Sequence, residues 1–268
     1  GGDKALLCMP LGYIAGKMVV VRSLVAGLEL IPIVPCGHPL SGMKESPTFA
    51  AMIPMQVYNS LQVPEERTVL EGIKHLIIGG GAIDDGLANE LKHFPNNVWS
   101  TYGMTETLSH IALRRLNGNN ASDWYTPFDQ VHIRLSEEGT LVIHAPEVCA
   151  EELTTNDIAE INEKGEFRIL GRKDNTINSG GIKIQIEQVE ALLKPHLSTP
   201  FLITSTSDAK FGEAVVLLYE KGNEEELQAL CKAALPPYWM PKRFVQVEAI
   251  PLTETGKPNR PAARILAR

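Results

Sequence analysis

One stretch constrains the fold of this chain most. It is a short apolar run that is followed at once by three glycines and then by a helical pattern. Residues His75 to Ile78 predict a strand, Gly79 to Gly81 a turn and residues 84–93 a helix, and a second strand-like run begins at Asn97. This rhythm is typical of a parallel α/β sheet. Glycines also let a flat ligand lie against bare backbone at the carboxyl end of a strand. Because the run lacks G-x-G-x-x-G spacing, an ordinary tight turn is the alternative.

The segments before the glycines fit the same kind of sheet. Strands are expected over residues 6–10 and 28–34, with a helix over 13–26 between them that Gly27 closes. A further helix is expected over residues 48–61, kinked or broken at Pro54 because proline disrupts a helix interior.

Beyond residue 130 the pattern changes to short alternating strands. Residues 130–135 and 140–144, joined by a hairpin turn, and residues 166–170 predict a small antiparallel sheet or barrel. The polar stretch Gly171 to Asn175 is interpreted as a linker and hinge. Strands over 177–184, 201–204, 214–219 and 243–247, with helices over 185–193 and 224–234, then form a compact α+β unit, and residues 251–260 an exposed loop. We therefore expect two domains, residues 1–173 and 174–268, the second small and mobile.

Composition narrows the class of function. The 268 residues carry a net charge of −7, which argues against general binding to nucleic acid or anionic membranes. The four scattered cysteines lack metal-type spacing, and no signal peptide or membrane-spanning run is visible, so a cytoplasmic protein with reduced thiols is expected. The histidines have no ligand spacing and predict no zinc site.

The stretch STYGMTE, residues 100–106, combines three kinds of chemistry. Tyr102 offers a ring for stacking on a base, Thr105 a hydroxyl for a phosphate oxygen, and Glu106 a carboxylate of the kind Mg²⁺ prefers. Together they suit a nucleotide phosphate, and a turn centred on Gly103 would carry them. Taken alone, the stretch could equally be an ordinary strand-to-loop turn.

Four motifs in order resemble the adenylate-forming enzymes, which include acyl-CoA synthetases. The motifs are STYGMTE, TTND (residues 154–157), GRKDN with SGGIKI (171–175 and 179–184), and PLTETGKPNR (251–260). The resemblance implies ATP or AMP, Mg²⁺ and coenzyme A as ligands. It also implies that Tyr102 stacks on adenine in a pocket lined by Gly80 and Gly81, that Thr105 contacts the α-phosphate and that Glu106 holds Mg²⁺. By the same resemblance, Asp157 and Arg172 bind the ribose, and Asp174 is the hinge of the small domain. Gly180 and Gly181 would line the pantetheine tunnel, and Lys257 would stabilise the adenylation transition state.

Residues 9–17 lie where the resemblance places substrate-facing side chains, with Tyr13 where many members have histidine. This segment is similar to that of 2-succinylbenzoate–CoA ligases of menaquinone biosynthesis, and Lys17 is a candidate partner for a second carboxylate or an ordinary solvated helix lysine. A generic acyl- or aryl-CoA synthetase is the alternative substrate class. Oligomeric state is left open, with a homo-oligomer as one option.

The glycine-rich phosphate loop of these enzymes is missing from the sequence, which begins without methionine. We therefore expect the carboxy-terminal part of a longer ligase, inactive in adenylation by itself. A non-catalytic nucleotide-binding module that has lost this loop is a hypothesis of a different class.

Overall fold

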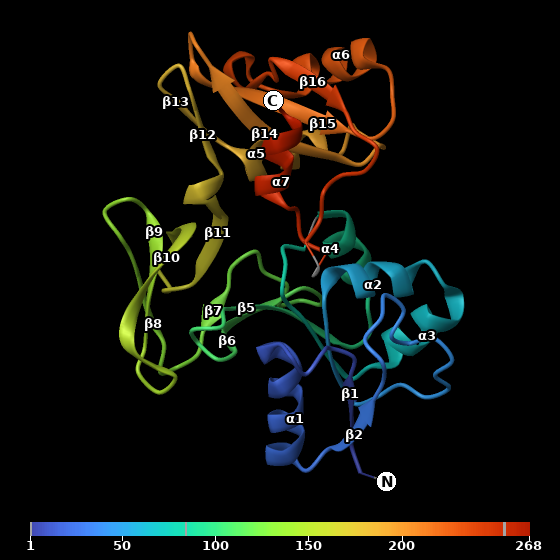
Figure 1. The fold of residues 1–268 in the computed structure, drawn as a ribbon. Helices are drawn as coiled ribbons and strands as arrows, with labels where there is room; N and C mark the ends of the chain where they lie inside the picture. The colour runs from blue at the N-terminus through green and yellow to red at the C-terminus, as the bar shows by residue number, and fades with distance from the viewer. Residues whose placement is uncertain (1, 84, 254–255) are drawn as a thin grey trace. The chain divides into compact units, whose positions relative to one another are not determined.

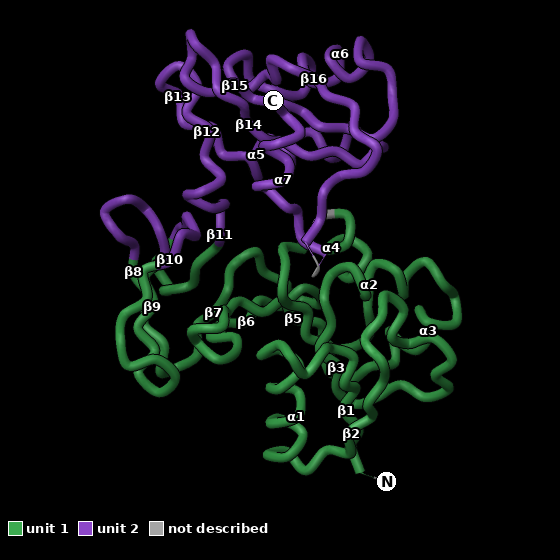
Figure 2. Tube along the Cα trace, viewed as in Figure 1, with its two compact units in different colours: residues 1–134, 142–154, 161–168 green, residues 135–141, 155–160, 169–268 purple. Residues whose placement is uncertain are grey.

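The computed structural model describes residues 2–83, 85–253 and 256–268, without the side chain of Asp85. The chain divides into two compact units, coloured separately in Figure 2. Unit 1 comprises residues 1–134, 142–154 and 161–168, and unit 2 comprises residues 135–141, 155–160 and 169–268. Each unit is described by itself below. The two domains expected from the sequence, with their boundary at residues 173 and 174, stay a prediction.

Unit 1 is built on a seven-stranded sheet of order β2-β1-β3-β4-β5-β6-β7 (Figure 1). The first five strands run parallel, whereas β6 pairs antiparallel with β5 and β7 antiparallel with β6. The strands are β1 (Lys4–Leu7), β2 (Glu29–Pro32), β3 (Phe49–Met52), β4 (His75–Ile78), β5 (Asn97–Gly103), β6 (His110–Arg115) and β7 (Thr126–Pro127). The expected α/β class with a parallel sheet is confirmed.

Helices cover both faces of this sheet because successive strand residues point to opposite sides. Leu7 and Ala51 pack with Val19 of α1, whereas Leu6 and Ala50 belong to the larger core that α2, α3 and α4 complete. The helices are α1 (Ile14–Ala26), α2 (Pro54–Leu61), α3 (Pro64–Gly72) and α4 (Asp85–Leu91). The helix expected over 84–93 is α4, and Asp84 lies outside the described residues.

The single helix expected over residues 48–61 is wrong. Phe49–Met52 is strand β3, which pairs parallel with both β1 and β4. Ile53, immediately before Pro54, is extended (φ −91°, ψ 157°), as expected for a residue that precedes proline. Pro54 is then the first residue of α2, where its missing N–H costs nothing. Proline therefore starts this helix instead of kinking it.

Helix α1 ends as expected, with Gly27 in the left-handed conformation (φ 64°) at its C-cap. Only Gly16, Val19 and Ser23 of α1 are buried. The apolar side chains of Leu24 and Val25 are 76% and 85% exposed. One apolar face of this helix therefore meets solvent.

The small antiparallel sheet expected after residue 130 is confirmed as four strands in the order β11-β10-β9-β8. The Ser136 backbone N–H donates to the Thr140 carbonyl across the expected hairpin turn, and Gly139 there has φ 78°. The strands are β8 (His132–Leu135), β9 (Thr140–Ala145), β10 (Cys149–Ile161) and β11 (Phe167–Arg172).

The carboxy-terminal part of unit 2, from residue 176 onward, is a mixed sheet with helices. Its strands follow the order β13-β12-β15-β14, and β16 pairs parallel with β15. The strands are β12 (Thr176–Ser179), β13 (Ile182–Gln185), β14 (Phe201–Asp208), β15 (Gly212–Tyr219) and β16 (Arg243–Gln246). The helices are α5 (Ile186–Leu193), α6 (Glu224–Ala234) and α7 (Arg260–Leu266), with 3₁₀ turns at Lys173–Asn175 and Pro237–Trp239.

Two stretches are more ordered than the sequence predicts. Gly171 and Arg172 end β11, and residues 173–175 form a 3₁₀ turn instead of an irregular linker. The side chain of Gln185 holds this turn, because its amide donates to the Arg172 carbonyl over 2.7 Å and its oxygen accepts from Thr176 Oγ1 over 2.9 Å. Helix α7, which begins at Arg260, was not expected. No described helix is long and apolar enough to span a membrane.

Candidate active site

The site begins where β5 ends, at the carboxyl edge of the parallel strands. Strand β5 runs through Tyr102 and ends at Gly103. The turn centred on Gly103 that the sequence suggested is therefore wrong. A Cβ on Gly103 would lie 2.4 Å from the Ser109 carbonyl oxygen and 2.5 Å from His110 Cα. Glycine is therefore required here for β5 and the start of β6 to approach each other.

Thr107 fixes the loop that joins these two strands. Its buried hydroxyl accepts from the Met104 N–H over 3.1 Å and donates to the Ser109 carbonyl over 2.7 Å. Thr105 and Glu106 are exposed on the same loop. The loop therefore presents a hydroxyl and a carboxylate to solvent on a backbone that a buried hydroxyl holds in place.

Tyr102 belongs to a cluster of three aromatic rings. Its ring centroid lies 5.0 Å from that of Phe167, edge to face, and 5.9 Å from that of Tyr125. Phe167 is fully buried, and the Tyr125 hydroxyl lies 2.7 Å from Ser100 Oγ. Packing on two rings orients the half-buried Tyr102 ring, as a stacking platform requires.

The glycine turn follows β4, the neighbour of β5. A Cβ on Gly79 would lie 2.2 Å from Thr101 Oγ1, so Gly79 is needed for the turn to pass β5. Gly80 has φ +80°, a left-handed conformation that glycine adopts without strain. Gly80 and Gly81 face Ile53 and Pro54 at the start of α2. Because β4 and β5 are parallel neighbours, Gly80 and Gly81 share one sheet edge with Tyr102.

Tyr13 and Lys17 lie at the start of α1. Tyr13 is the N-cap residue and is 49% exposed, and Lys17 is exposed one turn further along. Among the residues that the structure describes, neither side chain has a hydrogen bond or ion pair that would fix it. Their proposed contact with substrate stays a prediction.

Arg22, which the sequence analysis missed, connects α1 to the loop after β5. Its guanidinium donates to Ser109 Oγ and, over 3.1 Å, to His110 Nδ1. Burial lowers the pKa of Arg22, and within residues 2–83, 85–253 and 256–268 no acidic side chain forms an ion pair with it. Burial, together with the Arg22 charge, lowers the pKa of His110 to about 4. A partly buried cation with only neutral partners is suited to an anionic ligand.

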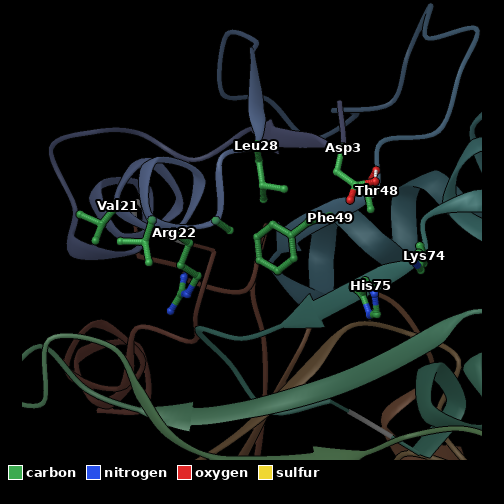
Figure 3. A pocket seen from close by; sticks show the side chains of 10 residues that line it. Asp3, Val21, Arg22, Leu28, Thr48, Phe49, Lys74 and His75 are labelled. Atoms are coloured by element: carbon green, nitrogen blue, oxygen red, sulfur yellow. Dashed lines mark hydrogen bonds between the residues drawn. The ribbon is translucent and has the colours of Figure 1, made fainter. Parts of the chain in front are cut away.

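Arg22 also lines a cavity of about 450 Å³ in unit 1. In the view of Figure 3, Val21 and Arg22 of α1 lie on one side of the Phe49 ring, and Lys74 and His75 on the other. The remaining lining residues are Asp3, Val25, Ala26, Leu28 and Thr48. Most of these residues stand at the amino ends of β1, β2, β3 and β4, the sheet edge opposite the loop after β5, and Asp3 accompanies the cationic side chains. The cavity is therefore separate from the candidate site.

Unit 2 brings Asp157, Arg172 and Asp174 together. Arg172 binds both oxygens of the Asp174 carboxylate, each over 2.9 Å, and Asp157 Oδ1 over 3.2 Å. The hydrogen bonds from Arg172 lower the pKa of the Asp174 carboxyl. Arg172 therefore links the residue expected at the ribose with the residue expected at the hinge.

The other predicted residues of unit 2 lie on two separate turns. Gly180 and Gly181 form the two-residue loop between β12 and β13, with φ values of 60° and 85°, as a type I′ hairpin requires. Lys257 is exposed in the loop that precedes α7. The structure thus groups Asp157, Arg172 and Asp174, and places Lys257 and the glycine pair on loops of their own.

Comparison with known proteins decides the family. The family model described as AMP-binding enzyme matches residues 1–151, more than half of the chain, and the model of the AMP-binding enzyme C-terminal domain matches residues 204–257. The chain belongs to the AMP-binding enzyme family. The resemblance to adenylate-forming enzymes is thereby confirmed.

Relatives and solved structures agree with this assignment. The 2-succinylbenzoate–CoA ligases of Bacillus cereus (strain ATCC 10987 / NRS 248) and Listeria monocytogenes serovar 1/2a are 24% and 23% identical over 95% and 96% of this chain. This chain spans 60% of the length of each. An acyl-CoA synthetase (AMP-forming)/AMP-acid ligase II-like protein from Dyadobacter fermentans is 32% identical, with a TM-score of 0.62, over 97% of this chain and 77% of that one.

One further structure shares the fold at low identity. The o-succinylbenzoate CoA synthetase MenE of Bacillus subtilis, solved with its acyl-adenylate intermediate OSB-AMP, is 22% identical with a TM-score of 0.80. The match covers 97% of this chain and 60% of that one. The roles expected for individual residues of this chain are not tested by these matches and are proposed below.

Proposed function

We propose that this chain supplies the adenylate-binding and lysine-bearing parts of an ATP-dependent acid–CoA ligase. The loop after β5 carries the proposal: it presents Thr105 and Glu106 beside an oriented Tyr102 ring and the glycine turn of the neighbouring strand. Family membership and the names of the relatives support the same reaction class. A carboxylate attacks the α-phosphate of ATP, pyrophosphate leaves, and the thiol of coenzyme A then displaces AMP from the acyl-adenylate.

The residues of the nucleotide pocket would act by binding and orientation. Tyr102 stacks on adenine, which Gly80 and Gly81 admit because they carry no side chain. Asp157, assisted by Arg172, accepts hydrogen bonds from the ribose hydroxyls. Thr105 donates to the α-phosphate. Fixing both reactants in this way removes much of the entropic cost of the reaction.

Two charged groups would stabilise the transition state. Glu106 fits Mg²⁺, because an exposed hard carboxylate can hold this ion together with substrate phosphates and water. No described cluster of three or more acidic, histidine or cysteine side chains offers a site made of protein alone. Mg²⁺ would neutralise charge on the phosphates. Lys257 would place its ammonium beside the oxygens on which negative charge develops.

The second half-reaction would use the hairpin between β12 and β13. Gly180 and Gly181 form a turn without side chains, along which a narrow pantetheine arm can pass. We propose Asp174 as the hinge residue, with the domain boundary between residues 173 and 174.

For the acid, we propose 2-succinylbenzoate, and hence a role in menaquinone biosynthesis. The relatives of this name support the choice. So does Arg22, a cation without an acidic partner among the described residues, which donates to Ser109 and His110 beside the loop after β5. A dicarboxylic aromatic acid needs a cation for the carboxylate that does not react. Arg22 is a stronger candidate for this role than the exposed Lys17.

Calorimetric binding of acyl-AMP mimics tests this proposal. The complete polypeptide encoded by the gene is titrated with non-hydrolysable adenylate mimics of 2-succinylbenzoate and of a fatty acid. We expect tight binding of the succinylbenzoyl compound alone. Equal binding of both would refute the substrate, and binding of neither would refute the function.

The two half-reactions give a second test through Lys257. In Lys257→Ala, adenylation should slow by about 10²–10³-fold, since one preorganised donor typically contributes ~3–4 kcal/mol to the transition state. Thioester formation from supplied acyl-adenylate should be unchanged. Near-normal adenylation by this variant would remove the lysine from the reaction.

A further inference from the structure

A partly buried ion pair fixes the first residue of α7 in unit 2. Arg260 binds Glu190 of α5 through two parallel bonds, Nη1 to Oε1 over 2.6 Å and Nη2 to Oε2 over 2.7 Å. The two side chains are 19% and 21% exposed. Strand β14 completes the arrangement, because the Ile203 N–H donates to Glu190 Oε1 and the Ile203 carbonyl accepts from Arg260, each over 2.9 Å. Three elements thus meet at one guanidinium.

The loop that carries Lys257 leads directly into this arrangement. The Thr253 N–H donates to the Lys257 carbonyl over 2.7 Å, and the Lys257 N–H donates to Thr253 Oγ1 over 3.1 Å. Leu252 and Pro258 form an antiparallel bridge, and the Asn259 N–H donates to the Pro251 carbonyl over 2.9 Å. The backbone is therefore hydrogen-bonded in steps from Lys257 to Asn259, the neighbour of Arg260.

Helix α7, which follows the Lys257 loop, packs on the sheet of unit 2. Asn259 caps the helix by accepting from the Ala262 N–H. Ala263 and Ala267 are fully buried against Leu202, Val216 and Leu218 of β14 and β15. The helix has only seven residues, and the described bonds at its first turn are those of Asn259 and Arg260. Its start, and with it the base of the Lys257 loop, depends on Glu190.

We infer that Glu190 and Arg260 are positioning residues for Lys257, and this inference rests on the proposed adenylation. A lysine ammonium ends a flexible four-carbon chain, so its place in a transition state depends on where the backbone holds that chain. A displacement of 1 Å can cost 10²-fold in rate. Glu190 and Arg260 touch no reacting group themselves and act through the loop.

The test compares half-reactions in the complete polypeptide encoded by the gene. Glu190→Gln removes the charge of the acceptor, and Arg260→Lys removes the paired geometry while keeping the charge. In both, adenylation should slow by about 10- to 100-fold, as a displaced catalytic group does, while thioester formation from supplied acyl-adenylate is unchanged. Arg243→Ala is the matched control, because Arg243 binds the Ala267 carbonyl at the other end of α7. It should lower thermal stability and leave both half-reactions unchanged.

Two further readouts separate positioning from general stability. In the Lys257→Ala background, Glu190→Gln should slow adenylation no further, because the group that it positions is gone. Amide exchange at Gly256 and Lys257 should accelerate in Glu190→Gln and not in Arg243→Ala. Equal losses in both half-reactions, or an equal loss without Lys257, would overturn the inference. Normal adenylation by Lys257→Ala alone would instead overturn the proposed function.

Discussion

Arg22 and Lys17 are alternative cations for the second carboxylate of the acid. We expect Arg22→Ala to raise the Michaelis constant for 2-succinylbenzoate by about 10- to 100-fold, since hydrogen bonds to charged groups are worth about 1.5–3 kcal/mol. Lys17→Ala should leave it unchanged, which would refute the role of Lys17. Arg22→Lys controls for charge, because it keeps the cation and loses the fork that binds Ser109 and His110. An unchanged Michaelis constant in Arg22→Ala would reject Arg22.

His110 should make unit 1 less stable in mild acid. Its pKa is about 4 in the folded chain, lowered from 6.5 by burial and by Arg22. Between these values the unfolded chain binds a proton that the folded chain does not, so this contribution to stability is complete above pH 6.5 and is lost as the pH falls toward 4. His110→Gln should flatten the dependence of the urea midpoint on pH in this window. An unchanged slope would contradict the lowered pKa.

Among the elements, α6 offers a clean test of local helix chemistry. The Asn223 side chain accepts from the Glu225 and Glu226 N–H groups, and three glutamates occupy the first turn. Asn223→Ala should lower the free energy of unfolding of unit 2 by about 1 kcal/mol, the usual cost of losing an N-cap. Asn223→Asp keeps the acceptor, so its free energy of unfolding should stay within a few tenths of a kcal/mol of the value for the original chain. Denaturation with urea measures both, and equal losses would show that the cap is not the cause.

Elements with a strong local pattern could be predicted from the sequence. The helix that Gly27 closes and the strand before the three glycines were both expected. Residues 49–52 were not, because Phe-Ala-Ala-Met suits a helix equally well, and only pairing with β1 and β4 makes it a strand. Helix α7 was missed because its stability comes from contacts with distant residues, such as Glu190 of α5.

Some residues of the candidate site could be predicted from sequence motifs, and others could not. Motif order gave the residues of the loop after β5 and those of the loop before α7. It could not give Arg22, because that assignment depends on Ser109 and His110, which lie 87 and 88 residues away in sequence. Nor could it show that Tyr102 packs on Phe167. Roles that arise from tertiary contact leave no local pattern to find.

At the scale of the whole molecule, each unit has a core of its own. Leu76 is fully buried in unit 1 and Leu217 in unit 2. We therefore expect two thermal transitions instead of one. Leu76→Ala should lower the midpoint temperature of one transition and Leu217→Ala that of the other, because each change costs about 2–5 kcal/mol of folding free energy. Scanning calorimetry measures both, and a single transition lowered by either change would show that the units unfold together.

The exposed apolar face of α1 has a consequence for handling the chain in the laboratory. Leu24 and Val25 present branched hydrocarbon to the solvent on successive positions of one helix. We expect this face to contribute to adsorption on plastic, apolar resins and air–water interfaces, because moving exposed apolar side chains out of water is favourable. Lysine at these two positions should therefore reduce losses on dilution and foaming while leaving the buried residues of α1 untouched.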